Sequence, residues 1–217
     1  MNARDAARQM ARCCRQLAER GLIAGQDGNL SVRLSATRAL VTPSGLIKAQ
    51  VTPGDMVEVD LAGRRRRGRR KPTSELDLHL RILRHRPDVG AVVHAHPPVA
   101  TGFAVAGAGL DRFVLPELVV LVGPVPLVPY GTPGTPELGD RVEPYLGEHD
   151  AFLLANHGAV TMGSTIEAAW IRMESLEHAA RILLVARMLG KVSELGSEAI
   201  ARLEAQRKAW GRRESNG

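Results

Sequence analysis

Cysteine, aromatic residues and long hydrophobic runs are scarce in this sequence, and each shortage excludes a class of protein. Of its 217 residues only Cys13 and Cys14 are cysteines, and a disulfide between neighbours is strained, so no disulfide framework is expected. The pair is interpreted as helix packing residues, with metal binding or redox sensing as the alternative. No stretch approaches the roughly 20 uncharged residues that cross a bilayer. We therefore expect a cytoplasmic protein without a membrane partner.

Basic residues exceed acidic ones only because of a single run. The chain carries 29 Lys and Arg against 23 Asp and Glu, a net charge of +6. Seven of the basic residues lie in RRRRGRRK, Arg64–Lys71, and subtracting these seven from +6 leaves −1. The preceding DMVEVDLAG alternates like a strand and ends in a turn, so the arginines are expected to form a solvated edge strand, which resists aggregation. The alternative is a patch that attracts phosphate or nucleic acid. Aromatic residues, at 3% of the chain, are too few for a stacking surface, and we expect no nucleic-acid partner.

Hydrophobic residues make up 44% of the chain, enough for a sizeable core, and we expect one domain over residues 1–217. Neither the dinucleotide-binding fingerprint nor the phosphate-binding loop with its lysine occurs, which disfavours a doubly wound nucleotide fold. The order of elements instead favours an α/β or α+β arrangement in three layers. Periodicity and stop signals predict helices at residues 3–20, 73–85, 165–189 and after Gly190. Thr73 or Ser74 is expected to cap the second helix, and a polar end is expected to follow the last. Strands are predicted in NLSVRL, ALVTP, MVEVDL, GAVVHAH, LVVLVGPVPLVPY and AFLLANHGAVTMG, the last of which runs into a turn.

Two histidines at the end of an apolar run form the first candidate site. In VVHAHPP, His94 and His96 are two residues apart, and on a strand such residues point to the same face. Two converging imidazoles suit a zinc-type ion, which usually takes at least one more protein ligand. His157 in LLANHGAV and Glu75 at the start of a predicted helix are candidates for that ligand. For the pair alone, a structural role in the core or at an exposed edge is the alternative.

Small oxygen donors and backbone amides form a second group of candidates. Gly28-Asn29, the turn Thr42-Pro43-Ser44-Gly45 and Thr73-Ser74 offer hydroxyls, an amide and a helix N-terminus. Free N–H groups and the helix dipole favour an anion at such a place, so a phosphate is a candidate ligand. Each piece alone is also ordinary turn and capping chemistry.

Five motifs in a fixed order indicate a family. GNLSVR, TPSGLIK, KPTSE, HAHPP and NHG occur in this order over residues 28–158, and the pattern closely resembles the class II aldolase/adducin family. With the first and the long predicted helix, the resemblance covers nearly the whole chain. It implies a three-layer αβα fold with a central, largely antiparallel sheet, commonly assembled as a homotetramer with active sites between subunits. It also implies Zn²⁺, or another divalent metal, on His94, His96 and His157, with Glu75 as a ligand or as a base.

The same resemblance implies a phosphorylated ketose as the substrate. Asn29, Ser44, Gly45, Thr73 and Ser74 match the family's phosphate-binding motifs, with Thr73 replacing a more usual serine. The chemistry of the residues agrees. A metal that binds a ketose hydroxyl and carbonyl lowers the cost of forming an enediolate, and a carboxylate beside it can move the proton. A phosphate clamp supplies orientation.

Several reactions are compatible with the resemblance, because members of the family perform retro-aldol cleavage, epimerisation, dehydration and decarboxylation. L-Fuculose-phosphate aldolases use a tyrosine downstream of the histidine pair as an acid from a neighbouring subunit. Here that region reads DRFVLPELVVLVG, with Glu117 as the candidate catalytic residue, and no tyrosine follows Tyr145. A hydrogen-bonded interface residue is the structural alternative for Glu117, because an unpaired carboxylate in this apolar stretch would be costly to bury.

We expect metal-dependent cleavage of a ketose 1-phosphate to dihydroxyacetone phosphate and an aldehyde. The alternatives are a methylthioribulose-1-phosphate dehydratase and a pentulose-phosphate 4-epimerase. A non-enzymatic, adducin-like interaction module is a further alternative, but adducin heads lack the metal-binding histidines. The three histidines and Glu75 of this sequence therefore favour an enzyme.

Overall fold

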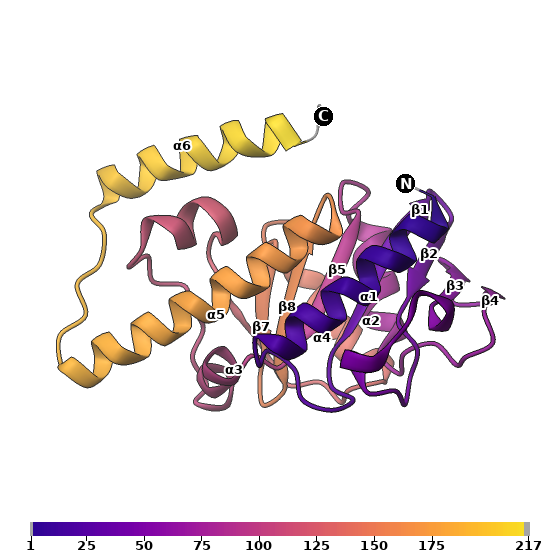
Figure 1. The fold of residues 1–217 in the computed structure, drawn as a ribbon. Coiled ribbons are helices and arrows are strands. Elements are labelled where there is room, and N and C mark those ends of the chain that lie inside the picture. Colours follow the sequence, from indigo (N-terminus) through magenta and orange to yellow (C-terminus); the bar gives the residue numbers. More distant parts are fainter. Residues whose placement is uncertain (1, 215–217) are drawn as a thin grey trace.

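One eight-stranded sheet organises the molecule (Figure 1). The computed structural model describes residues 2–214. Its strands are β1 (Asn29–Ser35), β2 (Arg38–Val41), β3 (Val57–Asp60), β4 (Arg65–Arg67), β5 (Ala91–Ala95), β6 (Leu127–Val128), β7 (Ala151–Leu154) and β8 (Gly158–Gly163). They lie in the order β4-β3-β2-β1-β5-β8-β7-β6, and every neighbouring pair is antiparallel except the parallel pair of β6 and β7. The expected largely antiparallel sheet is confirmed.

Helices cover both faces of this sheet and complete three layers (Figure 1). The α-helices are α1 (Ala3–Glu19), α2 (Leu76–His85), α3 (Pro98–Val105), α4 (Pro136–Val142), α5 (Ile166–Leu189) and α6 (Ser197–Glu214), and the short helices are η1 (Lys48–Gln50), η2 (Pro53–Asp55), η3 (Leu118–Val122) and η4 (Glu143–Tyr145). Helices α1, α3 and α5 share one hydrophobic core with the sheet, and α2 and α4 share the other. Val93 of β5 belongs to the first core and Val92 to the second, as the alternation of a strand requires.

Helix α1 forms as the sequence predicts. Asn2 caps it by accepting a hydrogen bond from the backbone N–H of Asp5 at 2.9 Å. Its apolar stripe faces the core, and Cys13 and Cys14 lie in that stripe as free, buried thiols. Burial raises the pKa of both thiols, that of Cys14 to about 12, so the reactive thiolate is suppressed. The two cysteines therefore act as packing residues.

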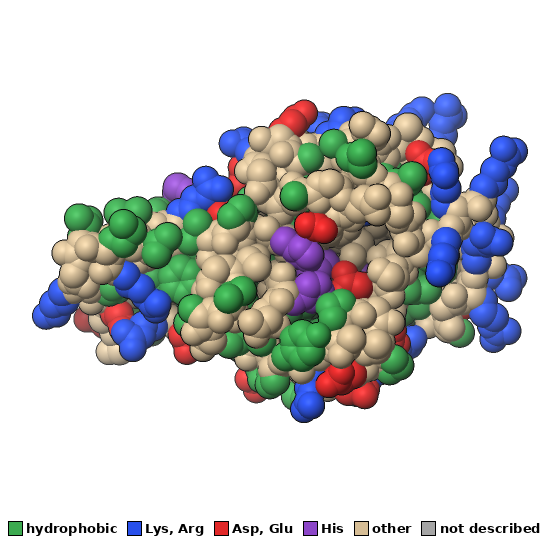
Figure 2. All heavy atoms as spheres, turned by 90° about the horizontal axis from the view of Figure 1, so that it is seen from below, with side chains coloured by type: hydrophobic (Ala, Val, Ile, Leu, Met, Phe, Trp, Pro, Cys, Tyr) green, Lys and Arg blue, Asp and Glu red, His purple; other side chains and the backbone are tan. Residues whose placement is uncertain are grey.

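The basic run Arg64–Lys71 forms a sheet edge, as predicted. Strand β4 lies at the end of the strand order and pairs only with β3, and its three arginines are exposed. In Figure 2, Lys and Arg side chains gather on the right, the side on which β4 lies in Figure 1. A solvated edge is thus the observed state of the run within this chain.

The start of α2 differs from the prediction that Thr73 or Ser74 caps it. The N-cap residue is Glu75, which makes no side-chain cap hydrogen bond. Thr73 Oγ1 instead accepts a hydrogen bond from the Glu75 backbone N–H at 3.3 Å, a turn that lies just before the helix and does not cap it. The chain therefore enters α2 with the Glu75 side chain free for other partners.

The stretch LVVLVGPVPLVPY is mostly not strand, and this part of the prediction is wrong. Leu118–Val122 forms a π-helix, η3, and only Leu127–Val128 pairs with the sheet as β6. Leu118, Val119 and Val122 are buried in this helical conformation, so tertiary packing outweighs the β-propensity of the valines. Gly123 ends the π-helix with a φ of 83°, a conformation that favours glycine.

The C-terminal part of the chain is helical, as predicted. Helix α5 confirms the long predicted helix, and α6 follows a linker and packs against η3 (Figure 1). The expected polar end lies largely outside the described residues. Within residues 2–214, no helix is long and apolar enough to cross a membrane.

Candidate metal and active site

Three histidines converge at one end of the central strands. His94 lies on β5, His96 just after its end, and His157 in the turn between β7 and β8. Their ring centroids are 4.7, 4.9 and 5.0 Å apart, and their candidate ligand atoms all lie within 4.8 Å of one another. His94 is fully buried, whereas Figure 2 shows histidine atoms at the surface near the centre of one face, flanked by acidic side chains. The structure thus brings together the three proposed ligands.

Two glycines make this convergence possible. A Cβ atom at Gly158 would lie 2.6 Å from the Ala95 carbonyl oxygen and 2.6 Å from the His96 ring. A Cβ atom at Gly28, where φ is +73°, would lie 2.9 Å from the carbonyl oxygen of His94. Both positions therefore require glycine, because close backbone approach leaves no room for a side chain.

Glu75 reaches the cluster from the start of α2. Its Oε2 lies 3.2 Å from His94 Nε2, and its Oε1 lies 3.5 Å from His157 Nε2. Asn29, the register partner of His94 on the neighbouring strand, donates from Nδ2 to Glu75 Oε2 at 2.7 Å. Burial raises the pKa of Glu75, but the charge of His94 and hydrogen bonds from His94 and Asn29 outweigh it and hold the pKa well below its usual range. Glu75 is therefore ionised at neutral pH.

The donor atoms of this cluster fit a zinc-type ion. His94 donates from Nδ1 to the Ala159 carbonyl at 3.0 Å, since a carbonyl only accepts, and in the neutral form of the ring its Nε2 lone pair therefore faces the cluster. The Nε2 atoms of His94 and His96 are 3.1 Å apart, near the roughly 3.3 Å between two nitrogens bound tetrahedrally to zinc at 2.0–2.1 Å. Glu75 Oε1 is buried without a hydrogen-bond partner among the described residues. Three imidazoles and this carboxylate can therefore hold a divalent metal.

The protonation of the other two histidines suits metal binding. Burial, and then the charge of His94, lower the pKa of His157 to about 4. The same two causes lower the pKa of His96. Burial also acts to lower the pKa of His94, but the facing charge of Glu75 outweighs it and raises that pKa. A metal competes with the His94 proton, since only the neutral imidazole is a ligand.

Four of the five candidate phosphate residues lie on two adjoining loops beside Glu75, and the fifth, Asn29, lies on β1. The backbone N–H of Ser44 donates to the carbonyl of Lys71 at 3.0 Å, which joins the loop of Ser44 and Gly45 to the segment before α2. Thr73 and Ser74 directly precede Glu75 on that segment. Gly45 and Ser74 are exposed, Ser44 is partly exposed and Thr73 is buried. The arrangement leaves hydroxyl groups accessible next to the cluster.

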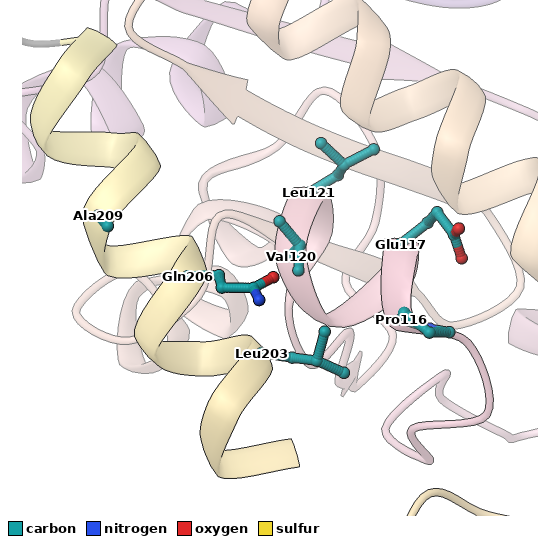
Figure 3. A pocket seen from close by; sticks show the side chains of 7 residues that line it. All are labelled: Pro116, Glu117, Val120, Leu121, Leu203, Gln206 and Ala209. Carbon is teal, nitrogen blue, oxygen red and sulfur yellow. The ribbon is translucent and has the colours of Figure 1, made fainter. Parts of the chain in front are cut away.

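Glu117 does not join the histidines within one chain. It precedes η3, is exposed, and lines two cavities, one of about 420 Å³ beside α6 and one of about 570 Å³ beside α5. Figure 3 shows its carboxylate pointing away from α6. The exposure removes the cost of burial that its apolar neighbours in the sequence suggest. A catalytic role for Glu117 stays a prediction and requires a neighbouring copy of the chain.

Two buried residues behind Glu75 were missed by sequence reasoning. His79 contacts Asn29 Oδ1 through Nε2, and its Nδ1 lies 2.7 Å from Ser31 Oγ. Both His79 and Ser31 are fully buried. The available signal was the spacing of four residues between Glu75 and His79, which puts both side chains on one helix face.

Two further residues support the site, Asp27 in the loop between α1 and β1 and Lys48 on η1, and sequence reasoning singled out neither as a candidate. Asp27 Oδ2 lies 3.6 Å from His96 Nδ1, which favours the tautomer whose Nε2 faces the cluster. Lys48, which is buried, donates from Nζ to the carbonyl of Gln26 at 2.7 Å and so holds this loop against η1. Lys48 ends the TPSGLIK motif, but its contact with the carbonyl of Gln26 is not visible in the sequence. Asp27 carried no signal, because isolated polar residues in glycine-containing loops are common.

Known proteins are similar to this chain in fold and in sequence. An L-fuculose phosphate aldolase of Methanococcus vannielii is 35% identical over 81% of this chain and 93% of its own. A 3-oxo-tetronate 4-phosphate decarboxylase of Pectobacterium atrosepticum is 36% identical over 85% of this chain and 86% of its own. A solved L-fuculose 1-phosphate aldolase structure matches with a TM-score of 0.88 at 29% identity, covering 94% of this chain and 96% of that one. The model of the Class II Aldolase and Adducin N-terminal domain matches residues 8–184, and the chain belongs to that family.

Proposed function

We propose that the protein is a metal-dependent sugar-phosphate aldolase, a carbon–carbon lyase. It cleaves a ketose 1-phosphate to dihydroxyacetone phosphate and an aldehyde, in the manner of an L-fuculose-phosphate aldolase. The observation that carries this proposal is the convergence of His94, His96 and His157 on the ionised carboxylate of Glu75. An adducin-like interaction module would have no use for such a cluster.

The three histidines would hold the ion, with Glu75 as a further ligand or as the base. Zn²⁺ is the proposed ion because nitrogen donors dominate the set, and a divalent ion supplies a Lewis acid that polarises a carbonyl oxygen. Glu75 Oε1, buried and without a hydrogen bond among the described residues, is the proposed proton acceptor. Asn29 holds the other carboxylate oxygen, which leaves Oε1 to move the proton.

The substrate phosphate is proposed to bind at the loops that precede Glu75. Asn29, Ser44, Gly45, Thr73 and Ser74 would form this site, with hydroxyl and amide donors for the phosphate oxygens. Because Ser74 directly precedes Glu75, a phosphate held there would fix the distance between the reacting carbons and the carboxylate. This supports a phosphorylated substrate over a free sugar.

The sequence has no tyrosine in the position of the aldolases' catalytic acid. Glu117 of a neighbouring copy, in a cytoplasmic homotetramer, is proposed to act as that acid. Glu117 is exposed at the cavity beside α5, next to Ile182, which is exposed although it is apolar. Apolar residues nearer the end of α5, including Met188 and Leu189, are exposed as well. Such a surface supports contact between copies.

A product assay tests the reaction. The metal-loaded protein is incubated with a panel of ketose 1-phosphates, and dihydroxyacetone phosphate and aldehyde are measured. The expected result is that one of the substrates yields both products in equal amounts. Release of carbon dioxide from a 3-oxo acid phosphate, without cleavage of any ketose, would replace the aldolase proposal with decarboxylation. That second candidate is supported by the 36% identical decarboxylase. Loss of water from methylthioribulose 1-phosphate would instead indicate a dehydratase, and interconversion of pentulose phosphates an epimerase.

A further inference from the structure

A line of buried hydrogen bonds runs behind Glu75. Ser31 Oγ lies 2.7 Å from His79 Nδ1, and His79 Nε2 contacts Asn29 Oδ1. Asn29 Nδ2 in turn donates to Glu75 Oε2 at 2.7 Å. The line joins two elements, because Ser31 and Asn29 lie on β1, His79 lies on α2, and Glu75 begins that helix. Ser31 and His79 are fully buried and Asn29 is 5% exposed, so water does not compete for these bonds.

We infer that His79 is a positioning residue that fixes the side-chain amide of Asn29, and through it the carboxylate of Glu75. The inference rests on the function proposed above for Asn29 and Glu75. His79 itself touches neither the histidine cluster's candidate ligand atoms nor the phosphate loops through any bond among the described residues.

The chemistry of the four side chains determines which group donates and which accepts in each hydrogen bond of this line. An ionised carboxylate only accepts, so Asn29 presents its NH₂ group to Glu75. The amide oxygen then faces His79, whose Nε2 must carry the hydrogen. Nδ1 of the neutral ring is left to accept from the hydroxyl of Ser31. Full burial, with the charge of His94, keeps His79 in this neutral form.

The direction of the bonds selects one of two amide orientations. If the amide of Asn29 turned over, its oxygen would face the Glu75 carboxylate and its NH₂ would face the His79 N–H. Two repulsive contacts between buried groups would then replace two hydrogen bonds, which disfavours the turned amide. With the amide fixed, Nδ2 has a second hydrogen for which the described residues provide no bond.

Substitutions at His79 separate positioning from packing. His79→Leu fills similar space without either bond, and His79→Gln keeps an N–H donor near the position of Nε2. We expect His79→Leu to lower kcat/KM by about 10–100-fold, the usual effect of losing a residue that orients a ligand. His79→Gln should recover most of this loss at a similar Tm. Ser31→Ala, which leaves the bond from His79 to Asn29 in place, should lose less than His79→Leu.

Nitrogen-15 NMR of the metal-free protein supplies a readout that is independent of turnover. The wild type should show His79 as the neutral Nε2–H tautomer, and the side-chain NH₂ signals of Asn29 should shift in His79→Leu and return in His79→Gln. An Nδ1–H tautomer, or Asn29 signals that do not respond to His79→Leu, would overturn the inference, as would a His79→Gln variant as impaired as His79→Leu. If the wild type cleaves no ketose phosphate, the proposed function fails, while the tautomer and the Asn29 signals still decide the role of His79.

Discussion

His94 and Ala159 are joined across the pair of β5 and β8 by a hydrogen bond of 3.0 Å from the imidazole Nδ1 to the backbone carbonyl. This bond fixes which nitrogen of His94 carries the hydrogen, and Nε2 is left facing Glu75. Because the acceptor belongs to the backbone, the pairing of the two strands itself orients the ligand. The fold and the proposed metal site are coupled at this point.

Replacing Glu75 with glutamine should abolish most catalysis without unfolding the protein. Glutamine still accepts a hydrogen bond from Asn29 but cannot take a proton, so kcat should fall by about 10²–10⁴, the usual span for a general acid or base. Circular dichroism and steady-state kinetics check both parts. Glu58→Gln is the matched control, since Glu58 on β3 is a buried glutamate paired with Arg38 on β2. A Glu75→Gln protein that turns over as fast as the control contradicts the assignment.

Removing the hydroxyl of Ser74 should harm the phosphorylated substrate selectively. A hydrogen bond to a charged group contributes about 1.5–3 kcal/mol, so the preference for a phosphorylated ketose over its unphosphorylated analogue should fall roughly 10- to 150-fold in Ser74→Ala. Ser44→Ala should act in the same direction. Ser35→Ala, at the other end of β1 from Asn29, is the control. Equal losses on both substrates would refute a phosphate role for the two hydroxyls.

Local sequence patterns predicted most helices and strands and the histidine cluster. They failed where the conformation or role of a residue depends on contacts with residues far away in the sequence. The spacing of His94 and His96 on a strand sufficed to align them. Their positions in the sequence made His157 and Glu75 candidate ligands, and the family resemblance then implied their roles. The helical state of Leu118–Val122 could not be read from its valines, because it depends on burial against other helices. His79 escaped notice because its role depends on partners 48 and 50 residues away.

Glu117 should act in a neighbouring subunit, and mixed oligomers test this. Glu117→Gln should impair turnover while metal content and oligomer size stay unchanged. Mixing it with Glu75→Gln before assembly should restore part of the activity, because some interfaces then combine an intact Glu75 with an intact Glu117. If Glu117→Gln dissociates the oligomer or leaves turnover intact, or if mixing restores nothing, Glu117 has no such role.

Acid should destabilise the metal-free protein partly through His79. Burial, and then the charge of His94, lower its pKa from 6.5 to about 3, so between these values the unfolded chain binds a proton that the folded protein does not. Stability therefore falls as pH falls through this window, by up to about 1.4 kcal/mol per pH unit for one proton. Urea unfolding at pH values from 7.5 to about 4.5 should show that the free energy of unfolding falls less steeply with pH in His79→Gln than in the wild type. Parallel curves for the two proteins would show that His79 is not held neutral.

Metal titration of the stripped protein tests the central claim most directly. A chelator should remove activity on the ketose 1-phosphate, and Zn²⁺ or another divalent ion should restore it in proportion to bound metal, with a maximum at one ion per chain. His96→Ala should bind little metal and recover little activity while it keeps most of its fold, because the fold rests on two large hydrophobic cores. Full turnover by metal-free protein, or full metal binding by His96→Ala, would contradict a catalytic ion held by His94, His96 and His157.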